Sequence, residues 1–350
     1  MRFERLASDV RLFARAGSEG WISLGDEAGL EAISAKRVRD ELASSLESLD
    51  GPRFADAAAR LRAIASSRSA GLWPPRWRLT LEILYDRIRP FWVLALLYIA
   101  IAVTYIVGYI AGSTRLLRWG SIAIMPVAAL HIAAIVARAV IAQKVMASNT
   151  YEYILVMTAV AAIAAIVLNL RSGEPAYGLV GSLLCGLGLA ATLLSPLSGK
   201  ITQLPPVLKS EWMTYHVGAA ALSYGVLYLA FGISIVFLLL SEKRQAAFRA
   251  RLFATNIALV RLGFFLLAIG IITGAIWADR AWGRYWGWDP KESWSLVAWC
   301  IYGIFLHLRF CLAAKRRRAV LVVVSIVGFM AVLFTFIGVN YILSGLHSYA

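Results

Sequence analysis

Charged residues are scarce in this 350-residue chain, where they make up 16% of the sequence against 60% for hydrophobic residues, with a mean hydropathy of +0.71. A soluble domain carries roughly 25% charged residues. The composition therefore excludes an ordinary water-soluble enzyme, and the abundance of apolar residues excludes a disordered protein. Acids are the scarcer sign, 20 against 35 Lys and Arg, which leaves a net charge of +15. Basic cytoplasmic loops of a membrane protein account for that excess. Nucleic-acid binding is not indicated, because no basic patch is evident on a soluble face.

Cysteine is rare too, and no targeting segment is evident. Cys185, Cys300 and Cys311 lie in apolar runs with no zinc-site or disulfide spacing. The chain does not start with a basic stretch followed by an apolar one, so we expect no cleavable signal peptide. Helical spacing near 27–48 and 53–67, and an amphipathic stretch at 79–89, predict a small N-terminal helical region, 1–89. The sequence does not indicate its role.

Apolar runs of about 20 residues, the length that a helix needs to cross a bilayer, follow from residue 90 onward. The eight predicted spans are 91–112, 119–140, 151–170, 176–196, 214–240, 258–278, 293–313 and 319–343. The third and fourth are short and joined by the sequence RSGEP, so a re-entrant pair is an alternative for them. The predicted fold class is all-α, a polytopic transmembrane bundle of about eight helices, with the membrane domain at 90–350.

Lys and Arg predict the orientation of this bundle. Basic residues gather in three loops of the same parity, around Arg115 and Arg118, around residues 243–251, and in the KRRR sequence at 315–318. The positive-inside rule places these loops in the cytoplasm. The loops 197–213 and 279–292 and the tail after residue 343 then face outward. By parity the N-terminal region is outside as well, which is awkward without a signal peptide.

The Trp-rich loop 277–299 holds half of the chain's twelve tryptophans: Trp277, Trp282, Trp286, Trp288, Trp294 and Trp299. An interfacial aromatic belt is one explanation, but a belt usually spreads over many helix ends. Here the rings are interleaved with Gly283, Gly287 and Pro290, and the charges are Arg280, Arg284, Asp289, Lys291 and Glu292. A flat aromatic shelf with a few fixed charges suits a large planar ligand that carries acidic groups.

The four histidines point to haem. His216, at the start of a span, and His347, just after the last one, are both predicted at the outer surface beside the Trp-rich loop. Two imidazoles at one depth suit axial coordination of a haem iron, and Arg280, Arg284 and Lys291 are the nearest cations for its propionates. The alternative is a pair of solvated surface histidines.

Two other histidines, His307 and His131, are predicted inside spans, with His307 toward the cytoplasmic half. Intramembrane ionisable groups are functional hypotheses by default, so His307 is a candidate ligand of an intramembrane haem and His131 a possible one. A neutral histidine hydrogen-bonded between helices is the alternative. Arg138 and Arg261 are expected to snorkel or to pair with a propionate.

These motifs resemble a known family. WGRYWGWDPKESWSLVAW, followed by YGIFLHLR, resembles the tryptophan-rich WWD signature of haem-handling proteins, and more narrowly the CcsA (ResC) family of System II cytochrome c biogenesis proteins. SEWMTYHVGAAALSYG, VNYILSGLHSYA and SNTYEY resemble further CcsA segments, and the resemblance covers about 91–350. The sequence AQKVMA stands where the family often has Gly-His-x-Pro, so any role of that histidine is absent. The first 90 residues have no counterpart in a minimal CcsA.

The resemblance implies a haem-lyase (cytochrome c synthase) subunit that handles haem b as a bound substrate. Haem is passed from His307 to an outer site formed by His216, His347, Trp282, Trp286, Trp288, Asp289, Trp294, Arg284 and Lys291. The implied partners are a CcsB/ResB-type membrane subunit, apocytochrome c, thiol-reducing thioredoxin-like proteins and membrane lipid, with no nucleic acid. No catalytic residue is implied, and whether the chain itself is an enzyme stays open.

The implied location is the bacterial cytoplasmic membrane, or a thylakoid-type membrane, with the haem site on the extracytoplasmic face. Two alternatives remain at this point: a haem exporter or chaperone of the System I type, and a b-type electron-transfer cytochrome. The second usually places its histidines in facing pairs within the membrane, unlike His216 and His347.

Overall fold

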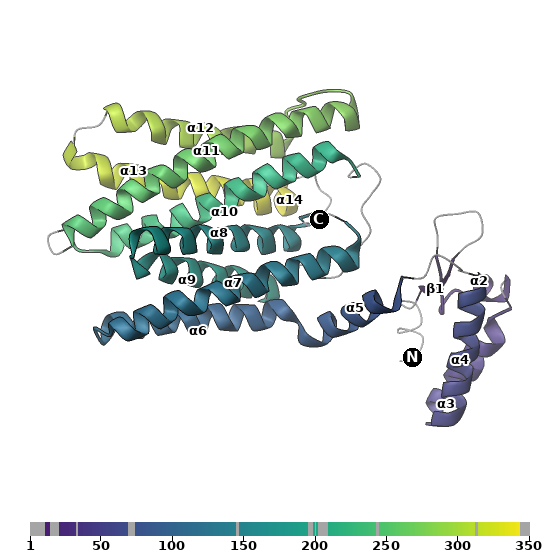
Figure 1. Cartoon of the computed structure of the whole chain (residues 1–350). Coiled ribbons are helices and arrows are strands. Elements are labelled where there is room, and N and C mark those ends of the chain that lie inside the picture. The colour runs from purple at the N-terminus through teal and green to yellow at the C-terminus, as the bar shows by residue number, and fades with distance from the viewer. Residues whose placement is uncertain are drawn as a thin grey trace. The chain divides into compact units, whose positions relative to one another are not determined.

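The structure is a computed structural model that describes residues 11–14, 21–32, 34–68, 74–144, 147–194, 199, 201, 209–242, 245–311 and 314–343. The chain forms two compact units, 1–80 and 81–350. Each unit is described by itself, and Figure 1 labels their elements.

The first unit is a small helical unit with one short hairpin. Its helices are α2 (Glu27–Ala32), α3 (Lys36–Glu47) and α4 (Gly51–Arg68), which confirms helices in the two predicted segments. The strands β1 (Arg11–Ala14) and β2 (Trp21–Ser23) pair antiparallel, a feature that the sequence pattern did not predict. Leu30, Leu42 and Leu61 are buried in a core of their own.

Helix α5 (Arg76–Ile88) runs across the boundary between the units and contains no buried residue. Trp77, Ile83, Leu84 and Ile88 are large apolar side chains that it leaves exposed. The predicted helix at 79–89 is therefore present, and its location at a membrane surface stays a prediction.

The second unit consists of long helices in up-and-down succession. They are α6 (Pro90–Ile110), α7 (Thr114–Ala142), α8 (Thr150–Ser172), α9 (Pro175–Leu194), α10 (Glu211–Leu239), α11 (Ala246–Trp282), α12 (Pro290–Cys311), α13 (Ala314–Leu333), the π-helix η2 (Phe334–Gly338) and α14 (Val339–Ile342). Among the described residues, seven helices are long and apolar enough to cross a membrane, and α12 occupies the remaining predicted span. The all-α polytopic bundle is confirmed, and the chain is an integral multi-pass membrane protein.

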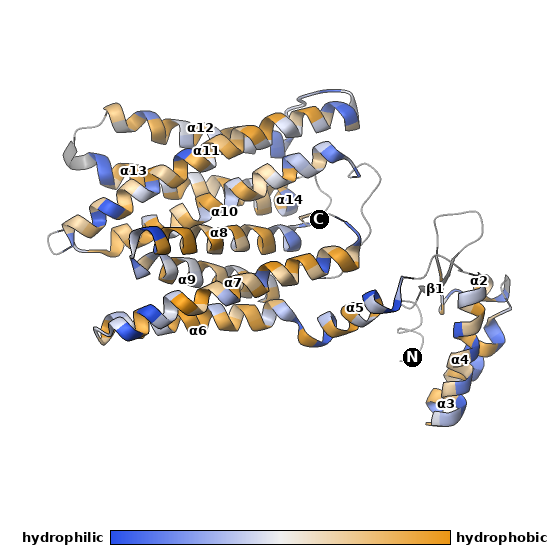
Figure 2. Ribbon diagram, viewed as in Figure 1, coloured by the Kyte–Doolittle hydropathy of each residue, from blue (hydrophilic) through white to orange (hydrophobic). Residues whose placement is uncertain are grey.

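A re-entrant arrangement was the alternative for α8 and α9. Each of these two helices is long enough to span a bilayer. They contact each other along their length, and α10 contacts α8, α9, α11 and α13. In Figure 2, orange apolar residues run along most of each helix, and hydrophilic residues gather mainly near the ends. Helix α10 thus joins the earlier helices of the bundle to the later ones.

A buried polar cluster joins α10, α11 and α13 in the middle of this unit. The Asn256 amide nitrogen donates to the Ala230 carbonyl oxygen at 2.9 Å, to Ser234 Oγ at 2.8 Å and to Ser325 Oγ at 3.3 Å. Lipid tails are as apolar as leucine side chains, so helices in a membrane associate through close packing and bonds of this kind. The cluster therefore fixes the relative position of three helices.

Candidate functional site

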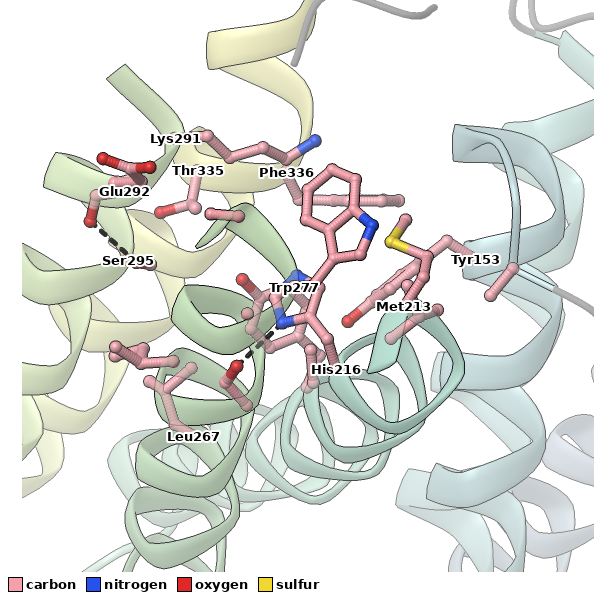
Figure 3. Close-up of a pocket in the computed structure, with 18 of the residues that line it drawn as sticks. Tyr153, Met213, His216, Leu267, Trp277, Lys291, Glu292, Ser295, Thr335 and Phe336 are labelled. Carbon is pink, nitrogen blue, oxygen red and sulfur yellow. Dashed lines mark hydrogen bonds between the residues drawn. The ribbon is translucent and has the colours of Figure 1, made fainter. Parts of the chain in front are cut away.

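A pocket opens at one end of the helical bundle. It contains about 1220 Å³ of empty space, open solvent at its mouth included. Its walls come from the start of α8, the start of α10, the end of α11, the start of α12, and η2 with α14 (Figure 3). Aromatic residues form much of the lining: Tyr153, Tyr224, Trp277, Tyr285, Trp286 and Phe336. A concave, mostly apolar site with a few convergent polar groups is typical of a ligand-binding site.

His216 projects into this pocket from the second turn of α10. Its Nδ1 lies 2.7 Å from the carbonyl oxygen of Gly270 on α11, a bond drawn as a dashed line in Figure 3. A carbonyl can only accept, so Nδ1 carries the hydrogen and, in the neutral ring, Nε2 carries the lone pair. The buried Trp277 ring lies parallel to the imidazole, with an interplanar angle of 2° and centroids 6.5 Å apart. The imidazole is thus held in the tautomer of a metal ligand.

The tryptophans of the Trp-rich loop divide into two groups. Trp277 and Trp286 line the pocket; Trp282 contacts Trp277 edge to face at 4.8 Å, and Trp288 contacts Trp286 at 5.8 Å. Trp288 is 71% exposed, so a large apolar ring is presented to the surroundings. Trp294 and Trp299 instead contact Phe334 and Phe264, which makes them helix-packing residues. The predicted shelf therefore comes mainly from the four rings that precede α12.

The backbone of this loop is held by a capping box at the start of α12. Asp289 Oδ1 accepts from the Lys291 amide at 2.9 Å, and Glu292 Oε2 accepts from the amides of Asp289 at 3.2 Å and Gly287 at 2.8 Å. Between those amides, Trp288 has a φ of 57°, a left-handed conformation that costs a residue with a side chain about 1–2 kcal/mol. The WDPKE sequence therefore positions Trp288, and Asp289, predicted to contact the ligand, acts as the helix cap.

Lys291 is a partly buried cation at the edge of the pocket, ahead of the predicted span 293–313. Its ammonium donates to Asn340 Oδ1 at 2.8 Å, and the Asn340 amide donates to Thr150 Oγ1 at 3.3 Å. Burial lowers the pKa of Lys291 from its ordinary value to about 8, a shift that the nearby Asp289 carboxylate opposes. Among the described residues, no carboxylate lies within salt-bridge distance of this ammonium. A partly buried cation whose hydrogen-bond partner among the described residues is a neutral amide favours an anionic ligand.

Arg280 and Arg284, the other cations predicted to meet propionates, are not among the residues that line the pocket. The Arg280 guanidinium lies 5.5 Å from the centre of the Trp212 ring. The Arg284 guanidinium packs against Gly287, where any side chain would collide with it. Of the three predicted cations, the structure brings Lys291 to the pocket.

The SNTYEY segment at 148–153 contributes Ser148 and Glu152 to a buried ion cluster beside the pocket. Asn149 caps α8 by accepting from the Glu152 amide at 2.9 Å, and Glu152 is fully buried. Its carboxylate accepts from Arg138 Nη2 at 3.1 Å and Ser148 Oγ at 2.7 Å, with Lys144 Nζ at 3.5 Å. Arg138 thus has a protein carboxylate as its partner, where snorkelling or a propionate was expected. The cluster fixes Thr150 and Tyr153 in the pocket wall.

The remaining predicted histidines are not part of the described pocket lining. His131 is fully buried, with Tyr98 Oη 3.4 Å from its Nδ1 and with Phe91 and Tyr98 edge-on to its ring, as expected of a histidine between helices. His307 is exposed on α12 and donates from Nδ1 to the Gly303 carbonyl at 2.8 Å. His347 lies outside the described residues.

Several pocket residues were not predicted from the sequence. The pocket lining includes Tyr153, Met213, Phe336 and Asn340. Glu292 accepts the hydrogen bonds that hold the backbone of the Trp-rich loop. A signal for Glu292 was present, because an acid three residues after Asp289 has the spacing of a capping box. Phe336 lies in the π-helix η2, and π-helical turns are frequent at functional sites.

The fold and the pocket define a multi-pass helical membrane protein with an aromatic ligand site at one end of its bundle. Residues 91–347 match the family model described as "Cytochrome C assembly protein". The chain belongs to this family, and the match begins one residue after the start of α6.

Individual relatives agree with that assignment. The chain is 40% identical over 152 residues to "Cytochrome c biogenesis protein CcsA" of Chlamydomonas reinhardtii, covering 42% of each chain. It is 37% identical over 210 residues to "Protein NrfI" of Wolinella succinogenes, covering 58% of this chain and 23% of the relative. It is 33% identical over 232 residues to CcsA of Guillardia theta, covering 58% and 75%. The chain thus spans less than half of the first two relatives, and the predicted resemblance to CcsA is confirmed. Membership gives it a part in cytochrome c biogenesis.

Proposed function

We propose that this chain is the membrane subunit of a System II cytochrome c synthase, which binds haem b as a substrate and presents it for covalent attachment to apocytochrome c. The observation that carries the proposal is the convergence of three features in one pocket. An imidazole is held in the ligand tautomer, a partly buried ammonium has a neutral amide as its hydrogen-bond partner among the described residues, and aromatic rings form the walls. Haem has a group that matches each feature: the iron matches the imidazole, the propionates match the ammonium, and the flat apolar ring matches the aromatic walls.

In this proposal His216 and His347 are the axial ligands of the iron. The bond from His216 Nδ1 to the Gly270 carbonyl supports the assignment, because such a partner fixes the ring and raises the basicity of the ligating nitrogen. Lys291 holds a propionate, and Trp282, Trp286 and Trp288 support the porphyrin face.

The proposed reaction is the addition of two cysteine thiols across the two vinyl groups of haem. Each sulfur bonds to the vinyl carbon next to the ring and the thiol hydrogen goes to the terminal carbon, so no net electron transfer occurs. The haem carries this reactivity, and the chain contributes ligation and position, which convert a bimolecular addition into an effectively unimolecular one. The thiols must be reduced, which accounts for thioredoxin-like partners, and a CcsB/ResB-type subunit completes the synthase.

The route of haem runs from His307 to the pocket in this proposal. His307 lies 16 residues beyond Lys291 on α12, or roughly 24 Å at 1.5 Å per residue. Its exposed position, with Nδ1 occupied by the Gly303 carbonyl, supports a ligand role for Nε2 toward the membrane.

An extracytoplasmic pocket is supported by the distribution of cations. Arg115 and Arg118 begin α7, Arg249 and Arg251 begin α11, and Arg317 and Arg318 begin α13. Each of these helices runs from its basic end to the end that carries the pocket. The positive-inside rule then assigns the pocket to the outer face of the bacterial cytoplasmic membrane or of a thylakoid-type membrane.

Haem content of histidine variants tests the proposal. We expect His216→Ala and His347→Ala to lower the haem retained by the purified chain, measured as the pyridine haemochrome, and to abolish cytochrome c maturation in cells. Added imidazole should restore part of the activity if only an axial ligand is missing. Normal maturation in both variants would overturn the axial assignment. If the chain binds haem but has no effect on the formation of the thioether bonds, a System I-type exporter or chaperone would be favoured instead.

A further inference from the structure

Helix α11 faces α10 with three glycines, Gly263, Gly270 and Gly274. A Cβ added to Gly263 would collide with Leu227, and one added to Gly270 would touch Ala220. Gly274 lies one turn beyond Gly270, on the same face of α11 and opposite His216. Small residues at a helix interface allow a close approach of two backbones.

The Gly274 position touches His216 itself. A Cβ at this position would stand 2.6 Å from Nδ1 and 2.8 Å from Cε1 of the imidazole, whereas ordinary contact begins at about 3.4 Å. Nδ1 lies 2.7 Å from the Gly270 carbonyl oxygen, next to the space that a side chain at residue 274 would fill. If the His216 ring moved away from a methyl group at residue 274, it would also lose its hydrogen bond to the Gly270 carbonyl oxygen.

We infer that Gly274 is a positioning residue for His216: its missing side chain lets the imidazole bond to the Gly270 carbonyl and so sets the orientation and donor strength of Nε2. The inference rests on the proposed role of His216 as an iron ligand. It gives α11 an influence on haem affinity and reduction potential, although Gly270 and Gly274 have no side chain that could bind iron.

Gly218→Ala is the control for Gly274→Ala. Both substitutions add one methyl group to a helical glycine near His216, and both raise helix propensity. A Cβ at Gly218, on α10, would meet nothing within 4 Å, and Gly218 is not among the described residues that line the pocket.

The experiment uses the full chain purified from membranes and titrated with haemin. We expect Gly274→Ala to weaken haem binding about 10–100-fold, the usual effect of losing the bond that supports a ligating histidine, and to raise the midpoint potential of the bound haem. The potential rises because an imidazole that no longer donates its N–H to a carbonyl stabilises ferric iron less. Gly218→Ala should stay near the wild type. Equal affinity and potential in Gly274→Ala and the wild type would overturn the inference.

A second pair of variants separates ring displacement from general damage. In a His216→Gly background there is no ring for the new methyl group to displace, so adding Gly274→Ala should change neither the haem affinity nor the midpoint potential any further. If Gly274→Ala fails to insert only when His216 is present, the clash is supported. If it harms the chain equally in both backgrounds, the inference is wrong. A His216→Gly chain that binds haem with unchanged affinity and potential would refute the proposed ligand role instead.

Discussion

The Lys291 ammonium is a charged group whose protonation state depends on what fills the pocket. It is partly buried, its hydrogen-bond partner among the described residues is the neutral Asn340 amide, and burial lowers its pKa to about 8. Above that pH the empty protein holds a neutral amine there, and below it a cation. An anionic ligand favours the cation and raises this pKa when it binds.

We therefore expect the affinity of the empty protein for haemin to fall as the pH rises through about 8. Lys291→Arg should remove that fall, because a guanidinium stays protonated throughout the range. Lys291→Met should be weak at every pH. Haemin titrations between pH 6 and 10 measure this, and identical pH profiles for the wild type and Lys291→Arg would contradict a propionate contact.

At the scale of the loop, Glu292 links the conformation of Trp288 to the start of α12. One carboxylate oxygen accepts from the amides on both sides of this residue, so the left-handed backbone is held from two directions. The exposed indole is thus presented by a small rigid turn.

Glu292→Ala should loosen this turn, at a cost of about 0.5–2 kcal/mol for a lost helix cap. Hydrogen exchange should accelerate at the amides of Gly287 and Asp289, and the amount of haem retained should fall. Glu211→Ala, which changes an acid in the first turn of α10, is the control. Unchanged protection of the two amides in Glu292→Ala would show that the turn is held by other contacts.

The buried Glu152 cluster and the exposed Glu174–Arg251 pair allow a matched comparison. Removing one partner of a buried ion pair costs about 3–5 kcal/mol, whereas an exposed pair contributes about 0–1 kcal/mol. We expect Glu152→Ala to lower the thermal midpoint of the detergent-solubilised chain strongly and Glu174→Ala to change it little. Equal shifts would mean that the cluster does not hold α7 against α8.

At the scale of the whole molecule, the proposed topology rests on the cations at one end of α7, α11 and α13. A reporter fused after residue 350 should read as extracytoplasmic, and one inserted between α12 and α13 as cytoplasmic. The opposite pattern would move the pocket to the cytoplasm and exclude a role in presenting haem to an exported apocytochrome.

The helices of the membrane unit were predictable because apolar runs without charges identify spans directly, as they did for α6 and α10. The location of His216 in a pocket was predictable for a related reason, since a histidine at the end of a span and near a Trp-rich loop is unusual. Other features needed coordinates. No periodicity indicates that Gly274 faces an imidazole, that Arg138 pairs with Glu152, or that Trp294 packs on Phe334 instead of lining the pocket. These depend on which faces of neighbouring helices meet.

Electron paramagnetic resonance of ferric haem bound to the purified chain, with and without His216→Ala, tests the central claim most directly. We expect a low-spin signal typical of two axial imidazoles in the wild type, its conversion to a high-spin signal in the variant, and its return when imidazole is added. A low-spin signal that is identical in the wild type and in His216→Ala would contradict ligation of the iron in this pocket.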